Sequence, residues 1–438
     1  MVILRGFSVR KPSFLMPKIV IYWKKGGVNM KIRKIRPEEL KRRWQLCGAC
    51  YLYPMDDAEK SAQEIYEAAR DNPQSRHDEH WQMNWAAYLD DDSTMIGAVT
   101  AIPYEVQFDG SRAAMAGIGG VATLPPYRRE GAIRGCFEAM LPELYAQGMV
   151  FSYLYPFSTA YYRKFGYELC CDRVRWRLKL ANVPKANVPG GCVLVEPPMD
   201  VENELRAVDA AWLARYNMMV YENAYEYKRH ARSNPYKTAE YTYLYRGADG
   251  APKGYFTWKL RKGNGERVVD VSRMAFADME GFYGLLNLML SMVADQSHAE
   301  FVLPADIDLC ALVPEWALWT VERRLEAAGM VRVVNAEAAL RLCRTRGEGS
   351  FVLELTDGQI AENNGRFTIC YGGGRVKRVE RTEAAPDIAM GIAAFSRMLA
   401  GRCDLDAYPA LPDVQVLTDN EAARGIFYRK PMYIQTYF

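Results

Sequence analysis

Long apolar runs are missing from this sequence. No stretch reaches the roughly 20 residues that a membrane-spanning helix needs, and the apolar run from Ile19 to Trp23 is too short for the core of a signal peptide. Residues 1–29 hold six basic residues and no acidic one, and Met30 then begins an alternating pattern typical of a strand. We therefore expect residues 1–29 to be a basic N-terminal extension outside the folded core.

Metal-binding patterns are also scarce. The ten cysteines are scattered, and Cys47 and Cys50 make one C-x-x-C with no second pair at zinc spacing. His77 and His80 stand in a polar loop where no third ligand is evident, so we predict no metal site. Scattered cysteines in apolar segments fit a reducing compartment better than a disulfide framework, which predicts a cytoplasmic protein.

A strong excess of one charge is absent. The formal net charge of the 438 residues is +3, but removing the six basic residues of the first 29 leaves 50 basic against 53 acidic residues. A mildly acidic body argues against nucleic-acid binding and allows a cationic substrate. Half of the residues are hydrophobic and a quarter charged, which indicates a globular chain of two to four domains.

The sequence features that point to a function are concentrated between Gly117 and Arg134. Residues 118–123 are small and apolar, as in a buried strand, and Pro125 and Pro126 end it. A turn with two arginines and Gly131 follows. The next segment has a helical pattern, with Ile133, Phe137, Met140, Leu141 and Leu144 on one face. Such a strand, basic turn and helix start can form an anion site, because the first amides of a helix have no partner. The alternative is a solvated loop.

A second motif follows closely. Residues 149–156 predict a buried strand, and Y-x-x-F-G-Y stands at Tyr162–Tyr167. Together the R-R-x-G turn and this motif resemble the GNAT superfamily of N-acetyltransferases, and more narrowly the Eis (enhanced intracellular survival) group. The resemblance extends over nearly all of the chain from about Met30. It implies a mixed α/β protein with tandem acyl-CoA N-acyltransferase (GNAT) folds and a sterol-carrier-protein-like α+β domain.

The pattern along the chain predicts three domains. A catalytic GNAT domain is expected at 30–172, a degenerate second GNAT domain at 173–328, and a sterol-carrier-protein-like domain at 329–438 that ends in the active site. The second copy has an acidic turn at 277–280, which would repel a pyrophosphate, so we expect it not to bind cofactor. Finer predictions are a strand over 96–108 broken at Pro103 and a helix over 388–399.

The resemblance implies acetyl-CoA as co-substrate, a primary amine as acceptor and no metal. The acceptor would be an aminoglycoside-like polyamine or a lysine side chain. The implied cofactor-binding residues are Val121, Ala122, Thr123, Arg128, Arg129, Glu130, Gly131, Ala132, Ile133, Arg134, Phe157 and Ser158. The resemblance also implies a homo-oligomer, by analogy a hexamer.

By position in Y-x-x-F-G-Y, Tyr162 matches the general acid of the Eis group. A phenol of pKa about 10 can protonate a departing thiolate. Tyr161 is the nearest rival, and both could be core aromatics. The general base of the group is the terminal carboxylate, here that of Phe438. The last six residues alternate and carry no charged side chain, which predicts a buried strand rather than a frayed end.

The acceptor pocket is harder to predict. Amine binding favours acids and aromatics, which makes Trp44, Asp56 and Asp57 candidates, although solvated loop acids or a core tryptophan explain them equally. A different function also stays open. In that alternative the chain is a non-catalytic binding protein that carries an apolar ligand in its C-terminal domain.

Overall fold

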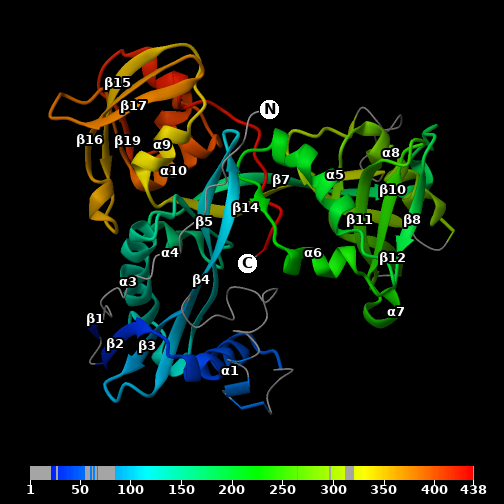
Figure 1. Ribbon diagram of the computed structural model, residues 1–438, viewed down its shortest axis with the longest axis horizontal. Coiled ribbons are helices and arrows are strands. Elements are labelled where there is room, and N and C mark those ends of the chain that lie inside the picture. Colours follow the sequence, from blue (N-terminus) through cyan, green and yellow to red (C-terminus); the bar gives the residue numbers. More distant parts are fainter. Residues whose placement is uncertain are drawn as a thin grey trace, which may run out of the picture.

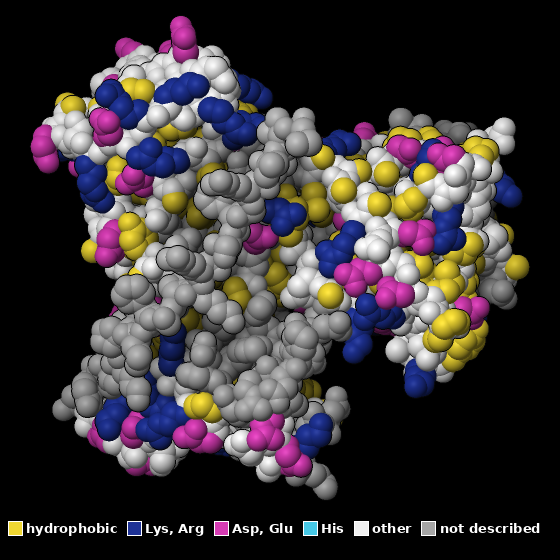
Figure 2. Space-filling view, viewed as in Figure 1, with side chains coloured by type: hydrophobic (Ala, Val, Ile, Leu, Met, Phe, Trp, Pro, Cys, Tyr) yellow, Lys and Arg dark blue, Asp and Glu magenta, His cyan; other side chains and the backbone are white. Residues whose placement is uncertain are grey.

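The computed structural model describes residues 21–25, 28–54, 60–61, 63–64, 67, 84–263, 265–294, 297–310 and 320–437. They form three lobes, and the C-terminal segment runs from the last lobe into the space between the other two (Figure 1). Over these ranges, no helix has both the length and the apolar character needed to cross a membrane. Acidic and basic side chains are interspersed on the visible surface (Figure 2).

The first lobe is an antiparallel meander that ends in one parallel pair. Its strands are β1 (Ile21–Lys25), β2 (Val28–Lys34), β3 (Asn84–Leu89), β4 (Met95–Phe108), β5 (Ser111–Thr123) and β6 (Phe151–Leu154). Its helices are η1 (Pro37–Glu39), α1 (Leu40–Tyr51), η4 (Pro125–Tyr127), α3 (Ala132–Ala146) and α4 (Thr159–Arg163). The five apolar residues predicted on one face of α3 are all buried against the sheet, so the helical prediction there is confirmed.

Two expectations for this lobe are wrong. Part of the N-terminal extension belongs to the large sheet, because the backbone of β1 pairs with that of β2; residues 1–20 lie outside the described ranges. The predicted break at Pro103 does not occur, and β4 is continuous. Among the described strands, β3 stops pairing with β4 at Thr100 and β9 begins at Glu105. Pro103 therefore has only β5 as a neighbour, where a missing N–H is tolerated.

The second lobe repeats the element order of the first, as the sequence predicts. Its strands are β8 (Gly191–Val195), β9 (Val220–Tyr221), β10 (Tyr241–Arg246), β11 (Pro252–Gly263), β12 (Glu266–Phe276) and β13 (His298–Pro304). Its helices are η5 (Leu180–Asn182), α5 (Glu202–Arg215), α6 (Ala224–Ala231), α7 (Pro235–Thr238) and α8 (Met279–Ser291). β12 and β13 run parallel with α8 between them in the chain, just as β5 and β6 run parallel around α3.

Two long strands join these lobes into one sheet. β14 (Val321–Val333) lies between β6 and β7 (Glu168–Lys179), and β7 continues to β13. The described part of the chain thus contains a single sheet of 14 strands that spans both lobes. The domain boundaries predicted after residues 172 and 328 fall inside β7 and β14, so neighbouring lobes share these strands.

The third lobe has a separate sheet in the order β17-β16-β15-β18-β19. Its strands are β15 (Gly349–Thr356), β16 (Gly365–Gly372), β17 (Arg375–Arg381), β18 (Ile388–Gly391) and β19 (Val414–Val416). Its helices are α9 (Ala336–Leu342), η7 (Ala361–Asn363), α10 (Ile392–Ala400), η8 (Leu405–Ala410) and η9 (Glu421–Gly425). The overall mixed α/β prediction is confirmed.

The predicted helix over 388–399 begins four residues late. Residues 388–391 form β18, parallel to β15, because alternate side chains (Ile388 and Met390) are buried there. Apolar side chains of this lobe fill its interior, including Phe351, Leu353, Phe367, Ile369 and Phe395, each at most 2% exposed. The filled interior gives no support to the alternative of a carried apolar ligand.

Candidate active site

The parallel pair β5–β6 separates part-way along its length. Pairing runs from Met115 with Phe151 to Ile118 with Leu154, and there β6 ends. β5 continues to Thr123, and within the described strands it has no partner on that side. Opposite the gap the pairing with β4 shifts register, and Gly120 adopts a left-handed φ of 55°. The result is a wedge whose β5 edge, at Val121–Thr123, can pair with an extended ligand.

Helix α1 covers the bulge from the other side. The guanidinium of Arg43 lies so close to Gly120 that a Cβ there would come within 2.2 Å of Nη2. Arg43 is 6% exposed and donates a hydrogen bond to Thr100 Oγ1. Tyr51, at the end of α1, donates to the carbonyl of Val121 at 2.7 Å. These two side chains were not predicted as site residues, because nothing in their local sequence distinguishes them from other helix residues.

The basic turn forms the opening of α3. Arg129 and Gly131 both have left-handed φ values (73° and 96°), and no side chain caps the helix. The amides of its first turn, at Ala132 to Arg134, are therefore left for a ligand. Arg128 and Arg129 are exposed and Arg134 is half-buried, so their charges can reach an anion, whereas Ile133 packs into the core. The turn thus has the unpaired amides and the positive charge that an anion site needs.

Tyr162 lies behind the wedge. Ser158 caps α4 by accepting from the amide of Tyr161, and Phe157 is 74% exposed at the rim. The Tyr162 ring packs edge-on against Phe137 and Phe157 at 6.0 and 5.3 Å between centroids and is 2% exposed. Burial, and then the neighbouring phenol of Tyr51, raise the pKa of Tyr162 far above its usual value, so the phenol stays neutral at any working pH.

Tyr161 has a different environment. Burial, followed by Cys136, raises the pKa of Tyr161 to about 12, while Arg134 opposes the rise. These neighbours belong to the start of α3, whereas Tyr51, the neighbour of Tyr162, contacts the bulge. Tyr162 is thus the more deeply buried tyrosine of the pair, at 2% exposed, while Tyr161 is half-buried.

The C-terminal tail approaches from the opposite face of the sheet. Leu154 of β6 packs into the core beneath α3, while Tyr153 and Tyr155 point to the other side. There the hydroxyl of Tyr155 donates to the carbonyl of Thr436 at 3.0 Å, and its ring stacks on Tyr437 at 4.0 Å.

The predicted terminal strand is wrong, because the tail is fixed mainly by side chains rather than by a ladder. Its residues from Tyr433 to Tyr437 form no strand, although Tyr433, Ile434 and Thr436 are buried. Thr436 Oγ1 donates to Glu222 at 2.6 Å. Phe438, the predicted base, lies outside the described residues.

Only one of the predicted acceptor residues lies in the described ranges. Trp44 is half-buried between α1 and the sheet, as a core tryptophan would be, and Asp56 and Asp57 lie outside the described ranges. The ten cysteines are free thiols, and within the described ranges no group of three potential ligands could hold a metal. The pair His77 and His80 also lies outside those ranges.

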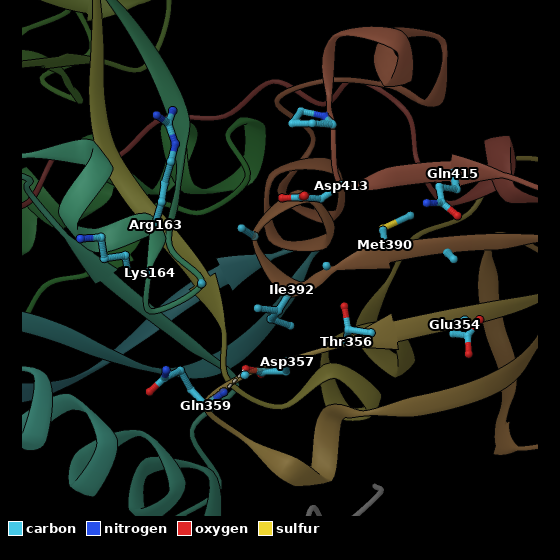
Figure 3. Close-up of a pocket in the computed structure, with 16 residues that line it drawn as sticks. Arg163, Lys164, Glu354, Thr356, Asp357, Gln359, Met390, Ile392, Asp413 and Gln415 are labelled. Atoms are coloured by element: carbon cyan, nitrogen blue, oxygen red, sulfur yellow. Dashed lines mark hydrogen bonds between the residues drawn. The ribbon is translucent and has the colours of Figure 1, made fainter.

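A cavity of about 560 Å³ lies elsewhere, between α4 and the last lobe. Arg163 and Lys164 stand on one side of it and Thr356, Met390 and Gln415 on the other (Figure 3). Neither Tyr162 nor the β5 edge at Val121–Thr123 lines this cavity. We therefore place the candidate active site at the wedge.

Comparison with known families agrees with this geometry. Residues 31–170 match the acetyltransferase (GNAT) domain family, and residues 336–434 match the sterol carrier protein domain family. The chain therefore contains a GNAT acetyltransferase domain followed by a sterol-carrier-protein-like domain, a combination that supports the resemblance to the Eis group stated from the sequence. The family match supports the predicted acetyltransferase, and the predicted combination of GNAT and sterol-carrier-protein-like folds is confirmed. GNAT domains in general use acetyl-CoA.

Solved structures share the fold over nearly the whole acetyltransferase chain. A probable N-acyltransferase of Enterococcus faecalis aligns at 21% identity and a TM-score of 0.78, covering 93% of this chain and 100% of its own. A GCN5-related N-acetyltransferase of Anabaena variabilis (18% identity, TM-score 0.77) and Eis1 of Mycobacterium abscessus (18% identity, TM-score 0.72) also align over 93% of this chain and 100% of their own. At these identities the likeness shows the fold alone. Comparison with curated protein sequences gave no match.

Proposed function

We propose that this acetyltransferase moves an acetyl group from acetyl-CoA to a primary amine by direct attack. Tyr162 donates a proton to the departing thiolate, and the terminal carboxylate of Phe438 takes the proton of the amine. The observation that carries this proposal is the wedge between β5 and β6, with a buried neutral phenol on one face and the chain's own tail on the other.

The wedge and the basic turn hold the cofactor. Backbone groups of Val121, Ala122 and Thr123 pair with the pantetheine arm as an added strand would. Backbone amides from Gly131 to Arg134 receive the pyrophosphate, with charge-assisted bonds from Arg128 and Arg129. Glu130 contributes its backbone to this turn. Phe157 and Ser158 line the far side of the pantetheine arm.

The two proton-transfer groups approach from opposite faces of the sheet. Tyr162 belongs to the core beneath α3, while Thr436 and Tyr437 contact Tyr155 on the other face. This arrangement lets the amine enter beside the tail while the thiol leaves beside the phenol. The second lobe stays without cofactor in this proposal, because Asp278 already accepts from the Gly281 amide at the start of α8. Assembly into a homo-oligomer remains a prediction.

The first test measures thiol release from acetyl-CoA with a panel of polyamines, aminoglycosides and lysine peptides. Tyr162→Phe keeps the ring contacts and removes only the hydroxyl, so kcat should fall by about 10²-fold or more with little change in KM for acetyl-CoA. Tyr161→Phe is the matched control and should lose less than about threefold. Release that persists at the wild-type rate in Tyr162→Phe would exclude this residue as the acid.

The second test concerns the base. A Gly-Ser-Gly extension after Phe438 displaces the terminal carboxylate, and kcat should fall by about 10²-fold because general base catalysis contributes that much. The same three residues at the N-terminus serve as the control. Full activity of the extended chain would show that another group takes the proton.

A further inference from the structure

A cavity of about 320 Å³ lies beneath the C-terminal tail. Its wall includes Arg173, Arg175, Lys259, Arg273, Gln435 and Tyr437. Tyr437 is also the residue that stacks on Tyr155, directly after the end of β6. The cavity therefore adjoins the wedge on the face where the tail lies, which is the face from which the acceptor amine enters in the proposed reaction.

Positive charge dominates this wall. Among the described residues that line the cavity, four are cationic and one, Asp270, is anionic. Asp270 lies 3.5 Å from Arg261, which further offsets its charge. Arg273 is held between two carboxylates, Asp209 at 2.8 Å and Glu222 at 2.7 Å, so its charge is balanced from behind. Arg173, Arg175 and Lys259 are the cations that remain for a ligand.

One carboxylate behind the wall pairs with several guanidinium groups. Glu326 accepts from Arg173 Nε at 3.1 Å and from Arg175 Nε at 2.8 Å, and it also pairs with Arg324. Burial alone would raise the pKa of Glu326, but hydrogen bonds from Arg175 and Arg324 outweigh this and lower it to about 2. A single negative charge therefore faces three positive ones, and the wall keeps a net positive charge.

Two further groups of the wall have unused hydrogen-bonding capacity. Lys259 is exposed and forms no ion pair with any residue that the structure describes. The side-chain amide of Gln435 is buried, and neither its nitrogen nor its oxygen has a partner. Buried polar atoms are nearly always hydrogen-bonded, so a ligand with an acceptor group would complete this site.

Arg43 adds a further cation, outside the cavity, on the acceptor side of the sheet. It covers the bulge at Gly120, and its Nε is buried without a partner. No carboxylate in the described ranges forms an ion pair with it. A polycationic acceptor would meet like charges at both places.

We propose that the acceptor is an amine that also carries a carboxylate, which binds Arg173, Arg175 and Lys259 in this cavity. The proposal rests on the acetyl transfer proposed above and names its substrate class. Guanidinium forks match a carboxylate in geometry, and a partly buried site strengthens the attraction. The positive wall selects against aminoglycoside-like polyamines, which the balance of charge in the sequence had allowed.

The test uses acceptors that differ only in the group distant from the amine. 5-Aminopentanoate, 5-aminopentanamide and 1,5-diaminopentane carry a negative, neutral and positive group on the same carbon chain, and three- and seven-carbon homologues cover other reaches. We expect kcat/KM at saturating acetyl-CoA to be at least tenfold higher for the amino acid than for the amide at the best length, and lowest for the diamine.

Variants of the wall connect this preference to the cavity. Arg175→Gln and Lys259→Gln should each reduce the preference for the amino acid to below threefold by raising its KM, while thermal melting checks that both remain folded. Lys262→Gln removes an exposed charge from the same strand outside the cavity and should preserve the preference.

The outcomes separate the two proposals. Four outcomes would overturn this inference and leave the proposed acetyl transfer standing. They are a preference for the diamine, equal rates for the three acceptors, turnover of other amines only, and a preference for the amino acid that survives in Arg175→Gln and Lys259→Gln. No thiol release with any amine would overturn the proposed function, and the acceptor class with it.

Discussion

A buried ion pair attaches the last lobe to the catalytic sheet beneath the Y-x-x-F-G-Y motif. Arg332 of β14 and Asp357 after β15 both have fully buried side chains, and Nη2 of Arg332 donates to the two carboxylate oxygens at 2.9 and 2.8 Å. Asp357 also accepts from the Asn363 side chain and from the amide of Gln359. Gly166 leaves room for the guanidinium, because a Cβ there would come within 2.0 Å of Nη1.

We expect Asp357→Asn to destabilise the protein by about 3–5 kcal/mol. The amide keeps the volume and one acceptor oxygen, but Arg332 becomes a buried charge without a counter-charge, which is costly. Its Nε and Nη1 already lack partners, so no other group compensates. The double variant Arg332→Met with Asp357→Asn removes the buried charge as well and should recover most of the loss, since replacing both charges of a buried pair is often close to neutral.

The free energy of unfolding is measured from urea titrations followed by circular dichroism, with thiol release recorded for each variant. Asp406→Asn is the control, because its pair with Arg424 in the same lobe is exposed and should contribute at most about 1 kcal/mol. A loss below about 1 kcal/mol in Asp357→Asn would refute the reasoning. So would a double variant as unstable as the single one, since an uncompensated charge would then not be the cause.

Other predictions follow from single contacts. Gly131→Ala places a Cβ at φ 96°, costs about 1–2 kcal/mol locally and should weaken acetyl-CoA binding about 5- to 30-fold by calorimetry, without effect on KM for the amine. Tyr51→Phe removes the bond to Val121 and should lower kcat/KM for acetyl-CoA by about two- to tenfold; an unchanged value would show that the bulge needs no such support. Burial, and then Arg273, lower the pKa of His230 well below its usual value, so the unfolded chain binds a proton below about pH 6.5 that the folded chain does not. Stability should therefore fall between pH 7.5 and pH 5.5 in urea titrations, less so in His230→Gln, and equal slopes would contradict this.

Local patterns predicted the elements that hold the cofactor in the proposed function. The apolar period of α3, the two prolines after β5 and Gly131 in the turn each act through neighbours in sequence, and the structure has these elements where they were expected. Tyr162 could be named only by resemblance to a family, because the sequence does not tell a buried acid from a core aromatic. Its burial, and the proximity of Tyr51 on α1, arise only from the folded structure.

The sequence by itself determined the order of strands and helices, the repetition of that order and the glycine turn before α3, since these depend on side-chain period and turn chemistry over a few residues. Tertiary structure alone decided that β14 lies between β6 and β7, that Arg43 covers Gly120, and that the tail contacts Tyr155 above a basic cavity. Those contacts join residues up to 281 positions apart. Pairing at such separations depends on which buried surfaces fit together, and local periodicity contains no record of it.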